Sequence, residues 1–422
     1  MNLSQLITGQ EAYITGISGN GGIKDRLNEL GFIKGQKVKA IKAAPLRDPV
    51  EYEIMGYKLT IRKADAAAIN VDISDKPVNT MPPSFHHIQG QGRKKRMRGN
   101  CLHSDRPRTI NVALVGNPNC GKTTIYNYAT KSRERVANYA GVTVAAREAR
   151  LIIDNYRINL IDLPGTYSLK AYSPEEMFVT DYLLYNKPDL VLNVVDAGNL
   201  ERNLFLTTQL IDTGIKTVAA LNMYDELKQN KAKLDHKTLG GMLGIPFIPT
   251  VGSKGTGLLE LFRTIIKVYE GKDETVRQAR LNYGQEINDA IDSIISMVDG
   301  HTGQQDRLSR LDAIRILEND PGGILSLPRG INGSVINFAN RKRDQVEILL
   351  KNNISNEVVN MRYGFIEGAL AETYEPERKQ KVSISQQIDR VLTHKLLGLP
   401  VFFGIIWFIF FTTFRLGDLP MA

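Results

Sequence analysis

Residues 112–124 read VALVGNPNCGKTT, and this stretch decides the fold. An apolar run typical of a strand leads into Gly116 and a helical pattern follows Lys122, so the pattern G-x-x-x-x-G-K-T lies where a strand meets a helix. In that setting backbone N–H groups turn inward around a β-phosphate, the lysine neutralises the β and γ oxygens, and the threonine hydroxyl binds Mg²⁺. A glycine-rich turn formed by chance would lack this context. The predicted phosphate-contacting residues are Gly116, Asn117, Pro118, Asn119, Cys120, Gly121, Lys122, Thr123 and Thr124.

A second motif indicates which base is bound. The peptide N-M-Y-D at residues 222–225 follows the apolar run TVAALNM and lies in the position of the N-K-x-D motif of GTPases. A carboxylate at Asp225 accepts from the N1 and N2 donors of guanine, a pair that adenine does not offer, so the motif predicts guanine specificity. The tetrapeptide alone is a weak signal, and its order after the other motifs supports it. The predicted base-contacting residues are Asn222, Met223, Tyr224, Asp225, Val251, Gly252 and Ser253, with Lys254 next in the loop TVGSKGTG.

The peptide D-L-P-G at residues 162–165 ends another apolar strand pattern. An aspartate there holds Mg²⁺ through water, and the N–H of Gly165 meets a γ-phosphate. Thr143 lies in NYAGVTV, where a switch loop would lend its hydroxyl to Mg²⁺ only when the γ-phosphate is present; a threonine in an ordinary strand is the alternative. The expected Mg²⁺ ligands are Thr123, Thr143 and Asp162, and the other expected contacts of these two segments are Gly141, Val142, Leu163, Pro164 and Gly165.

The residues that follow D-L-P-G lack the usual catalytic side chain. They are Thr166 and Tyr167, at the point where many small GTPases place the glutamine that orients the attacking water. We therefore expect hydrolysis by this chain alone to be slow, or to rely on another positive or water-orienting element.

The wider pattern predicts several domains. From Thr109 onward apolar runs alternate with helical stretches, which is the signature of a parallel sheet with crossover helices. Before it, EAYITGI and QKVKAIKA are typical of strands and PVEYEIMGYKLTI of a hairpin, so a small β-barrel is expected. After it, Ile287, Ile291 and Ile294 recur at helical spacing and indicate an all-helical unit. The expected segments are a barrel at 1–74, a basic flexible linker at 75–108, an α/β P-loop domain at 109–270, a helical domain at 271–390 and the start of a membrane region at 391–422.

Charge and cysteine content indicate which partners and which cellular compartment suit the chain. The chain has 422 residues and a formal net charge of +9, which suits contact with nucleic acid, anionic lipid or phosphorylated ligands. The linker run RKKRMR at 93–98 is typical of a solvated segment, with lipid or RNA contact as the alternatives. The two cysteines, Cys101 and Cys120, give no disulfide framework and fit a reducing cytosol. Cys101 and the linker histidines are scattered, so we expect incidental residues there rather than iron ligands.

An apolar stretch lies near the C-terminus. Residues 396–414 read LLGLPVFFGIIWFIFFTTF without a charge, close to the roughly 20 residues that cross a bilayer as a helix. We therefore expect a transmembrane helix here. Lysines and arginines between Lys379 and Lys395 precede it and, by charge bias, predict that the large N-terminal part is cytoplasmic. Residues 1–10 lack both a basic start and an apolar run, so nothing there directs secretion.

Taken in order, GNPNCGKTT, AGVTV, DLPGTYSLKAYSPEE and LNMYDE resemble the cytoplasmic GTPase of the ferrous iron transport protein B family. The resemblance runs from about residue 109 to the end and includes DRVLTHKLLGLPVFFG, which is similar to the start of the family's first membrane helix. Residues 1–74, mainly through RLNELGFIKGQKV, resemble ferrous iron transport protein A, an SH3-like barrel. The chain is therefore similar to a fused A–B form.

The resemblance implies a protein of the bacterial inner membrane that couples GTP binding and hydrolysis to Fe²⁺ uptake. Asn119 matches the family's phosphate-loop asparagine, which implies a K⁺ ion standing in for an arginine finger, and Cys120 replaces the commoner serine. It also implies a GDI-like helical domain and a transport region with several membrane helices, so this chain is expected to be C-terminally truncated. The residues expected to serve hydrolysis are Asn119, Lys122, Thr143 and Gly165.

Other readings stay open beside this one. A GTPase of ribosome or RNA biology would suit the basic linker, but the apolar stretch at 396–414 argues against a nucleic-acid partner. A membrane-associated regulatory GTPase without a transport role is the other alternative. Expected partners are GTP or GDP, Mg²⁺, K⁺, Fe²⁺ and a lipid bilayer. A further alternative is that the barrel is a protein-interaction module that touches the P-loop domain. A homo-oligomer is left open.

Overall fold

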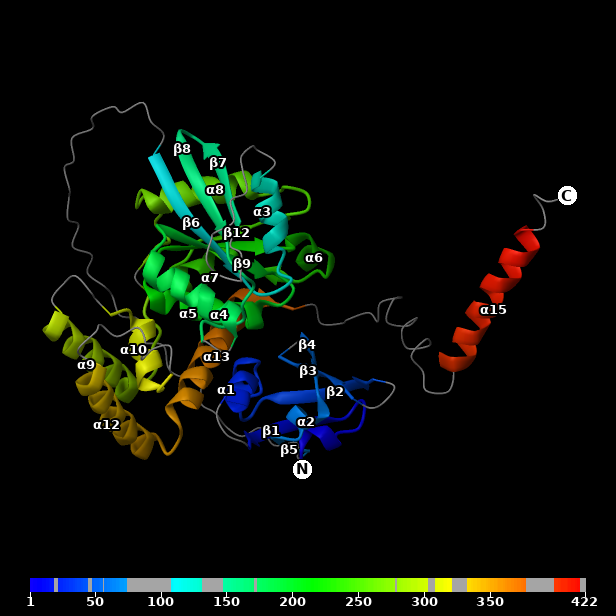
Figure 1. Cartoon of the computed structure of the whole chain (residues 1–422), viewed down its shortest axis with the longest axis horizontal. Helices are drawn as coiled ribbons and strands as arrows, with labels where there is room; N and C mark the ends of the chain where they lie inside the picture. Colours follow the sequence, from blue (N-terminus) through cyan, green and yellow to red (C-terminus); the bar gives the residue numbers. More distant parts are fainter. Residues whose placement is uncertain are drawn as a thin grey trace.

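The computed structural model describes most of the chain. The described residues are 1–18, 22–44, 48–55, 57–73, 108–130, 147–170, 173–277, 279–302, 308–320, 332–376 and 398–417. Within them lie three folded parts, which we call the N-terminal domain (1–73), the central domain (108–277) and the helical domain (279–376) (Figure 1). The predicted linker and the predicted switch residues Gly141, Val142 and Thr143 lie outside the described residues.

The N-terminal domain is a five-stranded antiparallel sheet in the order β4-β3-β2-β1-β5. Alternating side chains on its strands, among them Ile14, Val38 and Tyr52, are buried in one apolar cluster. The strands and the hairpin predicted from EAYITGI, QKVKAIKA and PVEYEIMGYKLTI are confirmed. The elements are η1 (Leu3–Gln5), β1 (Glu11–Ile17), α1 (Gly22–Glu29), β2 (Lys37–Ala43), β3 (Val50–Ile54), β4 (Tyr57–Ile61), α2 (Lys63–Ala66) and β5 (Ile69–Asp72).

The central domain is a six-stranded sheet in the order β12-β10-β9-β6-β8-β7, with helices on both faces (Figure 1). Five of its strands are parallel, as predicted, because helices cross between them. Its strands are β6 (Arg108–Gly116), β7 (Arg147–Ile153), β8 (Tyr156–Asp162), β9 (Leu190–Asp196), β10 (Thr217–Asn222) and β12 (Phe247–Pro249). Its helices are α3 (Lys122–Thr130), α4 (Pro174–Asp181), η2 (Tyr182–Asn186), α5 (Leu200–Thr213), α6 (Tyr224–Gln229), α7 (His236–Leu243) and α8 (Leu258–Tyr269).

The predicted parallel sheet has one further strand at its edge, which is antiparallel and was not predicted. Strand β7 runs antiparallel to β8, and the two are joined by Asp154 and Asn155. Both residues have positive φ, 46° and 64°, which is the conformation of a two-residue hairpin turn whose twist matches the flanking strands. A tight turn of this kind brings the chain straight back alongside itself, so no crossover helix is needed.

The helical domain follows, with one departure from an all-helical unit. Ile287, Ile291 and Ile294 are buried in its core, as their spacing predicted. The departure is β13, which pairs with β11 of the central domain. The elements of the helical domain are α9 (Gln285–Thr302), α10 (Arg310–Leu317), α12 (Asn332–Leu350), α13 (Ile354–Thr373) and β13 (Tyr374–Glu375), and β11 of the central domain is Lys233–Leu234.

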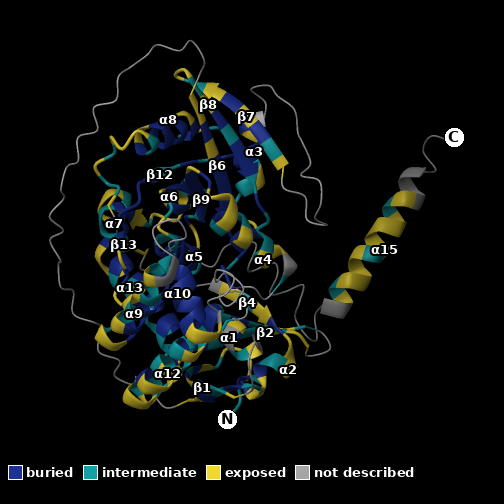
Figure 2. Cartoon of the chain, turned by 60° about the vertical axis from the view of Figure 1, so that its left-hand side comes forward, coloured by how far each residue is buried: buried dark blue, intermediate teal, exposed yellow. Residues whose placement is uncertain are grey.

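Helix α13 joins all three domains. It contacts α5 and α7 of the central domain and α1 of the N-terminal domain, and Figure 2 shows its buried side within this junction. The ring of Tyr363 stacks on Phe205 of α5 with 5.0 Å between centroids. Its hydroxyl donates to the backbone oxygen of Glu29 at the end of α1. The apolar core therefore runs without a break from the central domain into α13.

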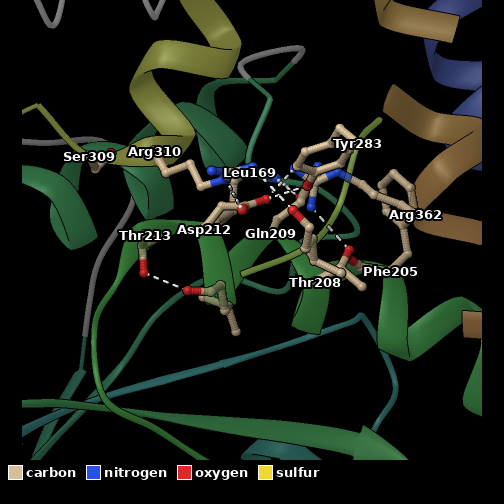
Figure 3. A network of polar contacts seen from close by, with 12 residues as sticks. Leu169, Phe205, Thr208, Gln209, Asp212, Thr213, Tyr283, Ser309, Arg310 and Arg362 are labelled. Atoms are coloured by element: carbon tan, nitrogen blue, oxygen red, sulfur yellow. Dashed lines mark hydrogen bonds and ion pairs between the residues drawn. The ribbon is translucent and has the colours of Figure 1, made fainter. Parts of the chain in front are cut away.

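A buried charge cluster fixes the helical domain on α5 (Figure 3). The Asp212 carboxylate is 0% exposed, and Nη2 of Arg362 donates to it over 2.8 Å. Nε of Arg310 lies 3.5 Å from its other oxygen, and the Tyr283 hydroxyl donates to the oxygen that Arg362 contacts. Arg362 also donates to the hydroxyl of Thr208 over 3.1 Å. Every cation and donor that meets Asp212 here comes from the helical side, so the cluster ties the two domains together.

The predicted transmembrane helix over 396–414 is not borne out. A helix, α15 (Gly398–Gly417), forms over this stretch, beginning two residues later and ending beyond Arg415. Over the part of the chain that the structure describes, no helix is long and apolar enough to cross a membrane.

We predict that Arg362→Ala lowers the free energy of unfolding by about 3 to 5 kcal/mol, because it leaves Asp212 short of a buried cation. Chemical denaturation followed by circular dichroism measures the change. Arg263→Ala is the matched control, since Arg263 pairs with Asp154 at the surface, where both side chains are about half exposed, and its loss should cost at most about 1 kcal/mol. Equal costs for the two variants would contradict the assigned role of the Asp212 cluster.

Candidate functional site

The predicted phosphate loop connects β6 to α3, as the sequence indicated. Gly121 has φ of +85°, and a Cβ added there would lie 2.1 Å from Nδ2 of Asn222. A Cβ on Gly116 would lie 2.7 Å from the backbone oxygen of Val194. Both positions therefore require glycine, because neighbouring groups approach the backbone too closely for any side chain. Asn119 also has positive φ, 66°, and is exposed on the loop.

The D-L-P-G peptide lies directly against this loop. Lys122 and Asp162 form an ion pair, and each side chain is only 11% exposed. A Cβ on Gly165 would lie 3.2 Å from Cα of Pro118, so a side chain there would fit only if Pro118 shifted slightly. Thr123 is exposed in the first turn of α3. The threonine hydroxyl and the aspartate carboxylate offer hard oxygen donors, the kind that Mg²⁺ prefers.

Asn222 links the phosphate loop to the loop after β12. Its side chain is buried, and its Nδ2 donates to the backbone oxygen of Cys120 over 2.9 Å. Its Oδ1 accepts from the backbone N–H of Gly252, also over 2.9 Å. One amide therefore holds three predicted motifs in fixed relative positions. Since buried amides are costly when unpaired, these bonds lock the geometry.

Asp225 forms an ion pair with Lys254 at the end of the site where the base motif lies. Lys254 Nζ lies 2.7 Å from Asp225 Oδ2, and the carboxylate is 29% exposed. The hydrogen bond from Lys254 lowers the pKa of Asp225, so the carboxylate stays ionised at neutral pH. Met223 precedes α6 in a left-handed conformation that turns the chain into this helix. Sequence reasoning placed Lys254 in the loop but missed its pairing with Asp225.

Tyr167 lies in the segment where many small GTPases have the catalytic glutamine, and its ring has an arginine partner. The guanidinium carbon of Arg202 lies 4.0 Å from the centre of the Tyr167 ring. The backbone oxygen of Arg202 accepts from Nδ2 of Asn117 in the phosphate loop over 3.4 Å. A cation held over an aromatic face in this way fixes the orientation of the ring. No local pattern in the sequence indicates this pair, because the two residues lie on different elements.

Cys120 is a structural residue of the loop. It is 1% exposed, and burial raises the pKa of its thiol to about 12. The group therefore stays a neutral thiol at physiological pH, and its sulfur packs against Gly116.

Not every predicted residue is placed. The phosphate loop, D-L-P-G, N-M-Y-D and the loop at 251–254 meet at the carboxyl ends of the parallel strands, which is where open α/β sheets bind ligands. Gly141, Val142, Thr143, Cys101 and the linker histidines lie outside the described residues. Among the residues that are described, no group of three or more histidine, cysteine, aspartate or glutamate side chains is arranged to hold a metal ion.

A glycine-dependent phosphate loop, an aspartate beside its lysine and an N-x-x-D motif bonded to the loop define a P-loop domain of the GTPase class. Three family descriptions match the chain: FeoA domain at residues 1–73, Ferrous iron transport protein B at 110–265 and FeoB cytosolic helical domain at 283–375. The chain belongs to the ferrous iron transport protein B family, with a FeoA domain at its N-terminus.

Individual relatives agree with this assignment. The Fe(2+) transport protein A/Fe(2+) transporter FeoB fusion protein of Porphyromonas gingivalis is 39% identical over 100% of this chain and 52% of its own length. The Fe(2+) transporter FeoB of Staphylococcus aureus is 35% identical over 74% of this chain and 46% of its own length. The chain thus spans about half the length of these relatives. A GDP-bound mutant of the S. thermophilus FeoB G-domain is 35% identical, with a TM-score of 0.56 over 63% of this chain and 100% of that one.

Proposed function

We propose that this chain is the GTP-binding and GTP-hydrolysing module of a bacterial Fe²⁺ transporter and that it works on the cytoplasmic side of the inner membrane. The observation that carries the nucleotide part is the Asn222 amide, which bonds the phosphate loop at Cys120 to the base loop at Gly252. This arrangement sets the distance between a phosphate site and a base site. The S. thermophilus FeoB G-domain of similar fold is described as bound to GDP, which supports the same ligand here.

Each part of the site has a role in this proposal. Asp225 reads the guanine edge, and the loop at 251–253 faces the guanine oxygen through its backbone. Lys122 neutralises phosphate oxygens, and the Gly165 N–H reports whether a γ-phosphate is present. Thr123, Asp162 and Thr143 would hold Mg²⁺, which would supply positive charge to offset that of the phosphates. The full set of proposed nucleotide contacts is Gly116, Asn117, Pro118, Asn119, Cys120, Gly121, Lys122, Thr123, Thr124, Gly141, Val142, Thr143, Asp162, Leu163, Pro164, Gly165, Asn222, Met223, Tyr224, Asp225, Val251, Gly252 and Ser253.

Hydrolysis needs a substitute for the missing glutamine. Tyr167 carries no amide to orient water, and its ring is covered by Arg202. Asn119 is exposed on the phosphate loop, in a left-handed backbone conformation. An amide oxygen there suits K⁺, whose charge beside the phosphates would stabilise the transition state.

The first prediction concerns the base. Asp225→Asn exchanges an acceptor for a donor, so GTP affinity should fall at least tenfold while xanthosine triphosphate affinity rises. Titration with fluorescent nucleotides measures both constants. Glu226→Gln is the matched control, because Glu226 is the exposed neighbour in the same helical turn and should leave both affinities unchanged. Unaltered GTP binding by Asp225→Asn would remove guanine recognition from this motif.

The second prediction concerns the monovalent cation. GTP turnover should be faster in KCl than in NaCl at equal ionic strength, and Asn119→Ala should abolish the difference. Phosphate release under single-turnover conditions gives the rates. Asn230→Ala, an exposed asparagine at the end of α6, should keep the wild-type preference. Equal rates of the wild-type protein in the two salts would refute the K⁺ site.

The third prediction concerns transport. In an Fe²⁺-starved strain that carries the complete transporter gene, Lys122→Ala should abolish restored iron uptake, because the lysine is needed for phosphate binding. Uptake of radioactive Fe²⁺ measures the effect, with membrane levels of both proteins checked by immunoblot. Full uptake by the variant at equal protein level would separate transport from the nucleotide site and favour a regulatory GTPase with no transport role.

A further inference from the structure

The helix that follows the phosphate loop, α3, carries a buried hydroxyl without a hydrogen-bond partner. Tyr126 is 2% exposed, and its oxygen, Oη, is buried and makes no hydrogen bond with any of the described residues. An unpaired buried hydroxyl destabilises a protein, and phenylalanine would fill the same space without that cost. Such a group is accounted for when its partner becomes available only in another state of the protein. The position of Tyr126 indicates which group that partner is.

The Tyr126 hydroxyl lies toward the end of the β7–β8 hairpin where D-L-P-G begins. Its ring belongs to the apolar cluster between α3 and these two strands. Burial and then Asp162 raise the pKa of the hydroxyl, Arg147 opposes the rise and Glu148 adds to it. Arg147 pairs with Asp162 across the two strands, and Glu148 pairs with the residue before Asp162. The three charged groups that act on the hydroxyl therefore lie at one end of the hairpin, and the hydroxyl is at that end as well.

Asp162 and Tyr126 lie on the same side of the sheet. Side chains two residues apart in a strand point to the same face, and Leu160, two residues before Asp162, is buried in the apolar cluster beneath α3. Asp162 therefore points to the α3 side. On α3, Lys122 and Tyr126 are four residues apart and share one face of the helix. Because Lys122 pairs with Asp162, the hydroxyl lies one helical turn beyond the lysine that holds this carboxylate.

The ion pair with Lys122 would leave Asp162 when a nucleotide binds. In the proposed complex the lysine turns to the phosphate oxygens, and the carboxylate loses the donor beside it. A carboxylate that holds a metal ion is normally kept in place by a hydrogen bond from a neighbouring group. A neutral hydroxyl suits this role, because it orients the carboxylate without cancelling the negative charge that Mg²⁺ needs. A second cation in the same place would compete with the ion.

We propose that Tyr126 is a positioning residue for the Mg²⁺ site: its hydroxyl donates a hydrogen bond to the Asp162 carboxylate once Lys122 has turned to the phosphates. The inference rests on the proposed nucleotide binding and adds to it a residue that none of the nucleotide motifs includes. It also accounts for a tyrosine inside an apolar cluster, since the hydroxyl is unpaired only while Lys122 holds the carboxylate. In this arrangement Tyr126 contacts neither the nucleotide nor the ion, and it acts through Asp162.

The dependence of nucleotide binding on Mg²⁺ tests the proposal. A fluorescent, non-hydrolysable GTP analogue is bound to the whole chain, and its rate of release is measured as Mg²⁺ is raised from zero in EDTA. Tyr126→Phe should need about tenfold more Mg²⁺ than the wild type for half-maximal slowing of release, while its affinity for the analogue in EDTA stays unchanged. Tyr128→Phe is the matched control, because Tyr128 lies on the same helix and is 42% exposed. It should keep the wild-type dependence on Mg²⁺.

The outcomes separate this inference from the proposed function. If the wild type does not bind the analogue, the nucleotide function fails and the inference fails with it. If the analogue binds and Tyr126→Phe keeps the wild-type dependence on Mg²⁺, the inference is wrong and nucleotide binding stands. Thermal unfolding in EDTA without nucleotide checks the fold: Tyr126→Phe should melt no lower than the wild type, because it removes only an unpaired hydroxyl. A lower melting temperature would mean that the hydroxyl already has a partner, which would overturn the inference.

A double-mutant comparison shows whether Tyr126 acts through Asp162. Asp162→Asn removes the charge that the hydroxyl orients, so adding Tyr126→Phe to it should shift the Mg²⁺ midpoint no further. Two additive shifts would mean that the hydroxyl serves another group, and would contradict the proposal. At saturating Mg²⁺ the GTP turnover of Tyr126→Phe alone should return to the wild-type rate, since excess ion compensates for weaker binding. Slow turnover at every Mg²⁺ concentration would also count against this role.

Discussion

The fully buried carboxylate of Asp212 determines how the helical domain sits on the rest of the protein. An ionised carboxylate inside a protein needs cations and donors around it, and here Arg362, Arg310 and Tyr283 supply them. All three come from the chain after the central domain, so the charge is satisfied only when α10 and α13 lie against α5. Apolar packing adds attraction along the same surface but is not directional. The charge cluster therefore sets the register in which the two domains meet.

Helix α5 carries this constraint to the nucleotide site. Asp212 near its end faces the helical domain, Gln209 holds the segment after D-L-P-G, and Arg202 near its start covers Tyr167. The contacts of Asp212 and of Lys170 differ in their balance of positive and negative charge. Asp212 is one carboxylate between two arginines, whereas Lys170 lies between the two carboxylates of Glu29 and Glu318, of which Glu318 also faces Arg362. Both contacts therefore join the central domain to the parts of the chain beside it.

The sequence predicted those parts of the fold that depend on short stretches of chain. The phosphate loop, the five parallel strands and the hairpin of the N-terminal domain are encoded by local patterns of glycine, apolar and polar residues, and the structure confirms them. The antiparallel β7 was missed, although Asp154-Asn155 is a turn signal, because the crossover pattern was extended over it. The charge contacts of Asp212 and Lys170 were missed for another reason. Their partners lie far away in sequence, and no periodicity relates them.

The ion pairs within the site show how it is held ready for a ligand. Lys122 is paired with Asp162 and Asp225 with Lys254, so each charged group that the ligand needs already has an opposite charge beside it. Binding therefore exchanges partners and does not expose bare charges. In the proposed complex, Lys122 would turn to the phosphates and leave the Asp162 carboxylate as a ligand for Mg²⁺, and guanine at Asp225 would displace Lys254, whose side chain is 63% exposed. Such exchanges would let a site that is held at Asn222, where its motifs are joined, accept a highly charged nucleotide.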